Sequence, residues 1–271
     1  MIARTVIIAC LAAVAQEAAA GPRALSADFC ADQLVLALAD RDDIAALSPD
    51  ADNDFSYLRD KSGGFLRTRA DSESVKALAP DVVLRFWGGD AARLKKLGFA
   101  VVTLTYADDF DGVKENIRAA ADALGRKDRG EALIAEMEAR LAALARRDGP
   151  HPRALYVTPG GVTAGRETMI DAILQAAGVA NIAADKGLQY WPSLPAESLV
   201  AAPPELIVAG FFTANSERVN HWSAARHPAL RGIFKETPTV HLPADVLSCP
   251  GWYSVDAAEM IAAAIEGADA N

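Results

Sequence analysis

Aromatic side chains stand beside glycine or proline at several points of this sequence, and flat apolar rings in loops suit the binding of a large organic ligand. A lone tryptophan belongs more often to a core than to a binding site. Here, however, the chain has four tryptophans and none lies in a predicted strand, which favours an aromatic binding cleft. The candidate ligand contacts are Phe86 and Trp87 before Gly88-Gly89, Tyr190 and Trp191 before Pro192, and Trp252 with Tyr253.

Catalytic chemistry is not indicated. No nucleophile elbow, phosphate-binding loop, zinc-binding His-Glu-x-x-His or dinucleotide-binding glycine pattern occurs in a suitable context. The four histidines are scattered, and the spacing of His221 and His227 does not place them on one helix face. Asp108, Asp109 and Asp111 lack the glycine and final glutamate of a calcium loop, so we interpret them as the start of a helix. We therefore predict a binding protein with no catalytic residue, no resident cofactor and no metal ion held by histidines.

The charge balance excludes one class of partner. The 271-residue chain carries a formal net charge of −9 at pH 7 and has a pI near 5.0. Nucleic acids are bound by clustered lysine and arginine side chains, so a nucleic-acid partner is not expected. With 51% hydrophobic and 23% charged residues, the composition is that of a folded protein rather than of a disordered segment.

The first 20 residues are predicted to be an export signal. Arg4 supplies a positive charge, Val6–Val14 is an apolar run, and Ala18-Ala19-Ala20 is a small-residue cleavage site before Gly21. The apolar run is too short for a membrane span, which needs about 20 residues. We expect the mature protein to reside in the periplasm.

The sequence repeats one pattern in its two halves. Residues 73–84 read ESVKALAPDVVL and residues 197–208 read ESLVAAPPELIV, so the two segments align without gaps at an offset of 124 residues. Each segment predicts a short amphipathic helix, a break at Pro80 or Pro204, and a buried strand. This order is common in α/β proteins, but its occurrence once in each half, followed by aromatic residues, indicates two related lobes.

A long helix is predicted between the lobes. Apolar residues recur at helical spacing within residues 128–148, and Asp128 with Glu131 matches a capping box. Twenty helical residues span about 30 Å, so this helix would be a rigid connection; a crossover helix inside one domain is the alternative. Alternating strands and helices on either side predict parallel sheets. The expected fold is α/β, with an N-terminal lobe at residues 21–127, a bridging helix at 128–148 and a C-terminal lobe at 149–271.

Three features together resemble the helical-backbone (class III) periplasmic binding proteins of ABC importers. They are the phrase RALSADFCADQLVLALADRDDIAALS at residues 23–48, the phrase SVKALAPDVVLRFWGG at residues 74–89, and the central helix. The resemblance covers essentially the whole mature chain. It implies two lobes around a shallow cleft and a monomer that captures a metal chelate. The family serves cobalamin, ferric siderophores and haem, and delivers them to transmembrane permease subunits.

The resemblance also implies roles for individual residues. Glu73 and Glu197, which begin the two repeated segments, match the glutamates with which the vitamin B12-binding branch docks on permease arginines. The alternative is that both glutamates simply suit the positive end of a helix. Phe86 or Trp87, together with Trp191, matches aromatic residues of the cleft in that branch.

Arginine replaces one aromatic residue of that branch. Arg67 falls at the position of a further cleft aromatic, and Arg69 and Arg166 are expected near it. Guanidinium groups facing the cleft would bind carboxylate, catecholate or propionate oxygens in pairs, whereas solvated loop positions are the other interpretation. A ferric siderophore or a corrinoid is the expected ligand, haem is an alternative ligand, and a secreted enzyme or chelatase on a similar scaffold is an alternative function.

The two cysteines of the mature chain, Cys30 and Cys249, are more often paired than free in an oxidising compartment. Their spacing does not settle the pairing. If the lobes follow the family pattern, both cysteines lie in loops near the cleft, and we hypothesise that a disulfide between them joins the lobes.

Overall fold

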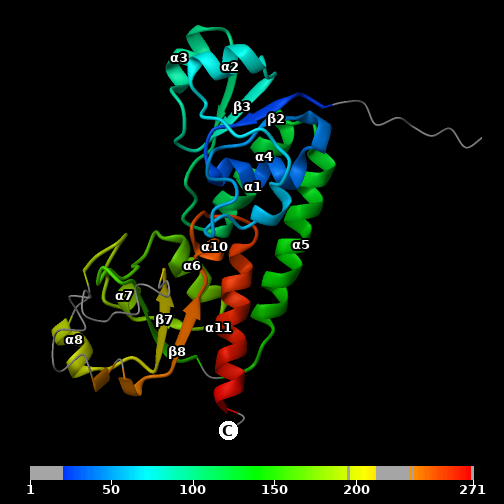
Figure 1. Ribbon diagram of the computed structural model, residues 1–271. Coiled ribbons are helices and arrows are strands. Elements are labelled where there is room, and N and C mark those ends of the chain that lie inside the picture. The colour runs from blue at the N-terminus through cyan, green and yellow to red at the C-terminus, as the bar shows by residue number, and fades with distance from the viewer. Residues whose placement is uncertain (1–20, 150, 194–195, 212–231, 234, 270–271) are drawn as a thin grey trace, which may run out of the picture.

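The computed structural model describes residues 21–149, 151–193, 196–211, 232–233 and 235–269 (Figure 1). The predicted export signal at residues 1–20 lies outside the described residues. Within the described part of the chain, no helix is both long and apolar enough to cross a membrane.

The N-terminal lobe is built on a four-stranded parallel sheet. Its strand order is β2-β1-β3-β4, so the first strand lies inside the sheet between the second and the third. Aliphatic residues make β3 a buried strand, as the sequence pattern predicted. The strands are β1 (Ala24–Ser26), β2 (Ile44–Ala46), β3 (Val82–Arg85) and β4 (Ala100–Thr103).

Aspartates begin the helices of this lobe. Asp28, Asp71, Asp90 and Asp109 each accept a backbone N–H from the first turn of the helix that follows. The interpretation of residues 108–111 as the start of a helix is therefore confirmed. The helices are α1 (Phe29–Leu38), α2 (Ser72–Leu78), α3 (Ala91–Lys96) and α4 (Phe110–Ala123), with single 3-10 turns η1 (Arg41–Asp43) and η2 (Arg59–Lys61).

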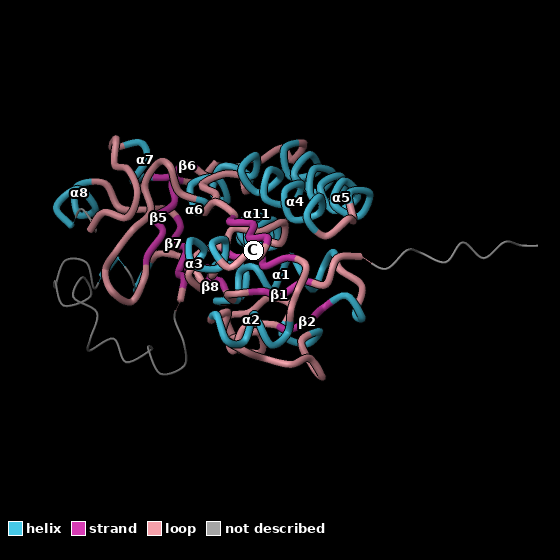
Figure 2. Tube along the Cα trace, turned by 90° about the horizontal axis from the view of Figure 1, so that it is seen from above, coloured by secondary structure: helices cyan, strands magenta, loops and turns pink. Residues whose placement is uncertain are grey.

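The long helix α5 (Lys127–Ala145) leads from the first sheet to the second. It packs along α4 in both Figure 1 and Figure 2, and a Cβ on Gly130 would press against Ala121 of α4. The predicted capping box is wrong, because Arg126 is the N-cap without a side-chain hydrogen bond and Asp128 lies inside the first turn. Ile134 and Met137 are buried, so the apolar face identified from the sequence packs against the protein.

The C-terminal lobe repeats the topology of the first. Its sheet is parallel throughout, with the order β6-β5-β7-β8, so the prediction of two similar lobes with parallel sheets is confirmed. The two repeated sequence segments end in the equivalent third strands, β3 and β7. The strands are β5 (Arg153–Val157), β6 (Ala180–Asn181), β7 (Leu206–Gly210) and β8 (Thr239–Leu242). The helices are α6 (Met169–Ala176), α7 (Ile182–Asp185), α8 (Ala196–Ala201), α10 (Ala244–Leu247) and α11 (Ser254–Asp269).

The second sheet is turned so that one of its ends faces the N-terminal lobe. Figure 1 shows the arrowheads of β7 and β8 pointing toward the N-terminal lobe, so the carboxyl ends of these strands face the other lobe. Ligands bind at the carboxyl ends of strands in open parallel sheets. The arrangement therefore places the carboxyl ends of β7 and β8 on the side of the sheet that faces the N-terminal lobe.

The chain returns to the N-terminal lobe after β8. α10 lies close to α1, and α11 runs beside α5 (Figure 1), where Arg140 of α5 pairs with Asp256 at 2.5 Å and Glu259 at 2.6 Å. Cys30 of α1 and Cys249 after α10 form a disulfide with a Cα–Cα distance of 5.6 Å. Buried residues from both sheets belong to one apolar cluster. The bridging helix is thus accompanied by a second crossing. Its disulfide is the one hypothesised from the sequence, whereas the course of α11 beside α5 was not predicted.

Candidate functional site

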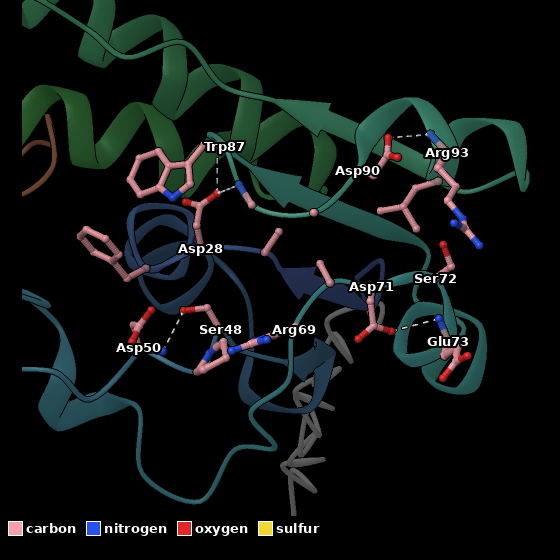
Figure 3. Close-up of a pocket in the computed structure, with 17 residues that line it drawn as sticks. Asp28, Ser48, Asp50, Arg69, Asp71, Ser72, Glu73, Trp87, Asp90 and Arg93 are labelled. Carbon is pink, nitrogen blue, oxygen red and sulfur yellow. Dashed lines mark hydrogen bonds between the residues drawn. The ribbon is translucent and has the colours of Figure 1, made fainter.

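A hollow of about 710 Å³ opens at the carboxyl ends of β1, β2 and β3 (Figure 3). Its walls are the loops after these strands and the first turns of α2 and α3. The volume lies in the range of small-molecule sites, about 300–1,000 Å³. The hollow brings together three residues that the sequence analysis considered separately, namely Arg69, Glu73 and Trp87.

Trp87 forms an exposed aromatic wall of this hollow. Its side chain is 48% exposed and meets the ring of Phe29 edge to face, with 5.4 Å between the ring centroids. Phe29 in turn meets Phe55 at 4.7 Å. Phe86 is only 9% exposed and belongs to the core. Of the two aromatic residues predicted at this position, Trp87 is therefore the one available to a ligand.

The backbone of the Trp87 loop is held from both sides. The buried Asp28 carboxylate accepts the N–H groups of Phe86, Trp87 and Gly88 at 2.8, 3.1 and 2.9 Å. The Arg85 guanidinium donates to the carbonyl oxygens of Trp87 and Gly88, both at 2.6 Å. The fixed backbone gives the Trp87 side chain a defined point of attachment, and a preorganised site binds at lower entropic cost.

Carboxylates outnumber guanidinium groups around the hollow. The backbone N–H of Ser74 holds the pKa of Asp71 below its usual value, so Asp71 is ionised at neutral pH. The hollow therefore has a negative electrostatic character, whereas an arginine-lined cleft had been expected. The acidic residues on its walls are Asp28, Asp50, Asp71, Glu73 and Asp90, and the basic residues are Arg69 and Arg93.

Two of the three predicted ligand-binding arginines are engaged elsewhere. Arg67 pairs with Asp52 and donates to the Ser62 hydroxyl at 3.2 Å, which ties it into its own loop. The expectation that Arg67 binds the ligand is thus not supported by its placement. Arg166 is exposed and donates to the carbonyl oxygen of Ala184 at 3.1 Å. Arg69 alone of the three lines the hollow.

Tyr190 and Trp191 form an exposed aromatic pair on the C-terminal lobe. They are 58% and 46% exposed, and Trp191 meets Tyr156 of β5 with 6.4 Å between the centroids. Tyr190 has a φ of 56°, which is unusual for a bulky residue, and its backbone N–H and C=O bond Arg166 and Gly165. Strained backbone of this kind concentrates at binding sites. The pair is therefore a second exposed aromatic surface.

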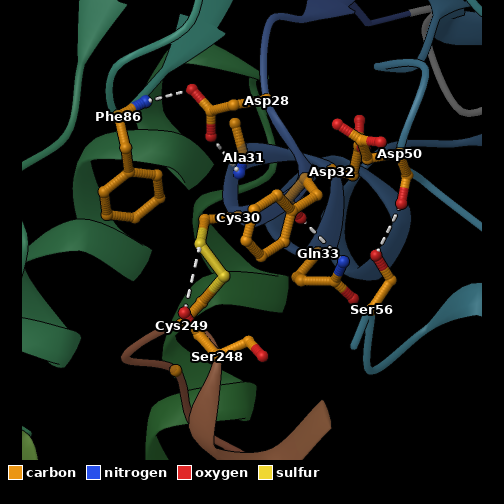
Figure 4. Close-up of a disulfide and its surroundings, with 12 residues drawn as sticks. Asp28, Cys30, Ala31, Asp32, Gln33, Asp50, Ser56, Phe86, Ser248 and Cys249 are labelled. Carbon is orange, nitrogen blue, oxygen red and sulfur yellow. Dashed lines mark hydrogen bonds between the residues drawn. A yellow bond between two sulfur atoms is a disulfide. The ribbon is translucent and has the colours of Figure 1, made fainter. Parts of the chain in front are cut away.

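Trp252 and Tyr253 are not placed as predicted. Tyr253 is 1% exposed and stacks on Tyr57 of the N-terminal lobe at 4.0 Å, while Trp252 is partly buried beside the same ring. Figure 4 shows the neighbouring disulfide between Cys30 and Cys249. The prediction that Tyr253 packs on the ligand is wrong, because this ring fills the contact between the lobes.

The two predicted docking glutamates lie in equivalent helices. Glu73 is exposed in the first turn of α2, at the rim of the hollow. Glu197 lies in α8, the counterpart of α2, but its side chain falls outside the described residues. In the described part of the chain, no three or more His, Cys, Asp or Glu side chains are grouped closely enough to hold a metal ion.

A family model described as periplasmic binding protein matches residues 30–223, which is more than half of the chain. The chain belongs to the periplasmic binding protein family. Curated relatives of this periplasmic binding protein include the cobalamin-binding protein of Halobacterium salinarum, which is 32% identical over 193 residues. That match covers 66% of this chain and 51% of the relative, so the chain spans about half the length of the curated relatives it matches.

Solved structures share the fold of this periplasmic binding protein. The periplasmic heme-binding protein RhuT from Roseiflexus sp. RS-1 is similar, with a TM-score of 0.70 and 24% identity, over 90% of this chain and 99% of that one. The periplasmic vitamin B12 binding protein BtuF of Vibrio cholerae is similar, with a TM-score of 0.66 and 20% identity, over 93% and 99%. At these identities the likeness establishes the two-lobed α/β architecture.

Several residues of the site carry no local signal in the sequence. Asp28 precedes the apolar pattern of α1, and this position signals an N-cap, but nothing local signals its bonds to residues 86–88. Phe29 and Phe55 join Trp87 only through tertiary contacts.

Proposed function

We propose that this chain is the periplasmic substrate-binding protein of an ABC importer, and that it captures a metal chelate without net negative charge. Ferric siderophores of the hydroxamate type and cobalamin-like corrinoids belong to this class. The observation that carries the proposal is the hollow of about 710 Å³ with an exposed, rigidly held Trp87 on its wall and an excess of carboxylates around it. The cobalamin-binding name of the curated relatives supports the corrinoid.

Binding would proceed without covalent chemistry. Trp87 on the N-terminal lobe and Tyr190 with Trp191 on the C-terminal lobe would pack on the apolar faces of the chelate. Burying apolar surface contributes about 25 cal/mol per Å². Arg69 and the Asp50 carboxylate of the hollow would bond the polar periphery of the ligand. Among the residues that the structure describes, no pair of titratable groups is placed for turnover, so nothing seen there favours the alternative of an enzyme or chelatase.

The negative charge of the hollow predicts different affinities for the candidate ligands. Haem carries two propionates and a ferric tricatecholate is a trianion, so both would meet carboxylates with like charge, which disfavours binding. Cobalamin and a ferric trihydroxamate avoid this cost. Haem therefore ranks behind both as a ligand, although the fold is shared with heme-binding proteins.

Delivery would use the rim of the hollow. Glu73, and Glu197 in the equivalent helix α8, are proposed to register the loaded protein on permease arginines, because rim charges set orientation and association rate. The double change Glu73→Lys with Glu197→Lys is expected to abolish transport and to leave chelate affinity unchanged. The matched control is Glu115→Lys with Glu136→Lys, on the exposed faces of α4 and α5. Normal transport in the first double variant would contradict docking through these residues.

Export is part of the proposal. Removal of residues 1–20 would release the mature chain into the periplasm. N-terminal sequencing of protein recovered from the periplasm should start at Gly21. Recovery of the full-length chain from the cytoplasm would contradict this assignment.

The decisive experiment is calorimetric titration of ligand-free protein with four probes: cyanocobalamin, a ferric trihydroxamate, hemin and a ferric tricatecholate. We expect saturable binding of one of the first two at micromolar concentration or below. Trp87→Leu should weaken that binding at least about tenfold, as loss of a central aromatic contact does, whereas Trp252→Phe should not change it. Preference for hemin or the tricatecholate would overturn the charge argument. Absence of binding by all four would remove the metal-chelate assignment.

A further inference from the structure

One buried carboxylate joins the two loops that form the aromatic wall of the hollow. Asp28 is 5% exposed and accepts four backbone N–H groups. Its Oδ1 accepts the N–H of Ala31 at 3.0 Å, which is the ordinary bond of a helix N-cap. Its Oδ2 accepts the three N–H groups of Phe86, Trp87 and Gly88, which belong to the loop after a different strand (Figures 3 and 4).

The second oxygen is not needed for the helix or for the sheet. The ladder between β1 and β3 already pairs Ser26 with Leu84, and the N–H of Ala27 bonds the carbonyl oxygen of Leu84 at 2.9 Å. The cap of α1 uses Oδ1 alone. What Oδ2 adds is the orientation of three consecutive peptide groups centred on Trp87.

The rest of the loop is built for the same single conformation. Arg85 binds the carbonyl oxygens of Trp87 and Gly88. A Cβ on Gly88 would collide with the carbonyl oxygen of Ala27, so the loop can approach β1 only because this residue is glycine. Gly89 adopts a φ of 71°, a left-handed conformation that glycine takes without strain.

We propose that Asp28 is the positioning residue of the ligand site: its Oδ2 holds Trp87 in the orientation that binds the chelate. The identity of the ligand in this inference rests on the proposed function. The positioning of Trp87 by Asp28 rests on the hydrogen bonds alone. Asp28 acts through Trp87 and makes no contact with the ligand, because its two oxygens already accept four N–H groups.

The test is a double-mutant cycle on affinity for whichever of the four probes binds the wild-type protein. Asp28→Asn keeps the size of the side chain but replaces one acceptor oxygen with an amide NH₂, which leaves up to three buried N–H groups without an acceptor. We expect affinity to fall about 10- to 100-fold. In a Trp87→Leu background the same change should alter affinity less than twofold, because the residue that Asp28 positions is gone. Equal losses in both backgrounds would overturn the proposal and indicate a general structural role.

Asp43→Asn is the matched control. Asp43 is also buried, at 6% exposed, and accepts the N–H of Gly21 at 2.8 Å, but it precedes β2 at the opposite edge of the sheet. It should lower stability without changing affinity. If Asp28→Asn does not fold, Arg85→Met removes the carbonyl side of the same clamp and should show the same dependence on Trp87.

A readout without ligand separates this inference from the proposed function. Time-resolved fluorescence anisotropy of Trp87, obtained by subtracting the matching Trp87→Phe protein, reports motion of the indole itself. We expect faster depolarisation and stronger acrylamide quenching in Asp28→Asn, and no change in Asp43→Asn. If no probe binds but the anisotropy changes as expected, the proposed function fails and the positioning role stands. Unchanged Trp87 anisotropy in a folded Asp28→Asn protein would refute the positioning role.

Discussion

Replacing Cys30 and Cys249 with serine is expected to destabilise the protein by several kcal/mol without changing its fold. The two cysteines are 219 residues apart, so the disulfide closes most of the described chain into one loop. In the chain-entropy description, a loop of this length restricts the unfolded state by an amount worth about 5 kcal/mol at 25 °C. Measured losses for native disulfides run from about 2 to 5 kcal/mol, so we expect a loss near the upper end.

The fold should survive the change because other contacts cross at the same place. Arg59 pairs with Asp245 at 2.7 Å, the rings of Tyr57 and Tyr253 stack at 4.0 Å, and the Tyr57 hydroxyl donates to Asp256 at 2.7 Å. These contacts hold α10 and the start of α11 on the N-terminal lobe without the covalent bond. The disulfide therefore acts chiefly on the unfolded chain, and the native far-UV spectrum should not change.

Urea denaturation followed by both circular dichroism and tryptophan fluorescence measures this effect, and coincident transitions justify a two-state free energy. The wild-type protein in a thiol reductant should unfold at the same urea concentration as the double serine variant. The oxidised wild-type protein should unfold at a clearly higher concentration. Equal midpoints for oxidised and reduced wild-type protein would refute the reasoning, as would mass spectrometry that finds two free thiols in protein isolated from the periplasm.

Three further predictions concern single residues. Burial raises the pKa of Asp32 to about 6, above its unfolded value of 3.8, so its contribution to stability is complete below pH 3.8 and falls by about 3 kcal/mol as the pH rises through 6. In the Asp32→Asn variant, the urea midpoint should not show this decrease between pH 3.5 and about 7.5. The same decrease in the variant as in the wild-type protein would contradict the prediction. Gly88→Ala should destabilise the protein by about 1–3 kcal/mol, because its Cβ would collide with Ala27, and a wild-type midpoint would contradict that geometry. Tyr57→Phe removes one hydrogen bond to Asp256 but keeps the aromatic stack, so thermal unfolding should show a loss of about 1–2 kcal/mol, and no loss would argue against this bond.

The architecture was predictable because its signals are local. The repeated helix-proline-strand segments of residues 73–84 and 197–208 predict two lobes. Each segment ends in the third strand of its sheet. The bridging helix follows from apolar residues at helical spacing, although its first turn starts at Lys127 rather than with the predicted capping box. Periodicity identifies an element reliably, but its ends depend on a few hydrogen bonds that neighbouring side chains can shift.

The site was only partly predictable because its remaining residues depend on partners far along the chain. No residue near Tyr253 in the sequence predicts its contact with Tyr57. Because the two rings stack, Tyr253 is not exposed to a ligand. Arg67 pairs with Asp52 inside one long loop. The loop has no periodic pattern of apolar residues, so the sequence does not predict this contact. Trp87, by contrast, follows a buried strand and precedes two glycines, a local arrangement that correctly predicts an exposed loop at the carboxyl edge of a sheet.

The second crossing between the lobes bears on how this binding protein recognises its ligand. The bridging helix is not the sole link between the lobes, because α11 lies beside α5 and pairs with Arg140 of α5 and with Arg147 just after it. The disulfide adds a covalent tie between α1 and the segment that precedes α11. Large hinge closure would have to break these contacts together, so we expect the ligand to be met by surfaces already formed. The proposed positioning of Trp87 by Asp28 and Arg85 agrees with this expectation: where closure contributes little, affinity depends on side chains that are in position before the ligand arrives.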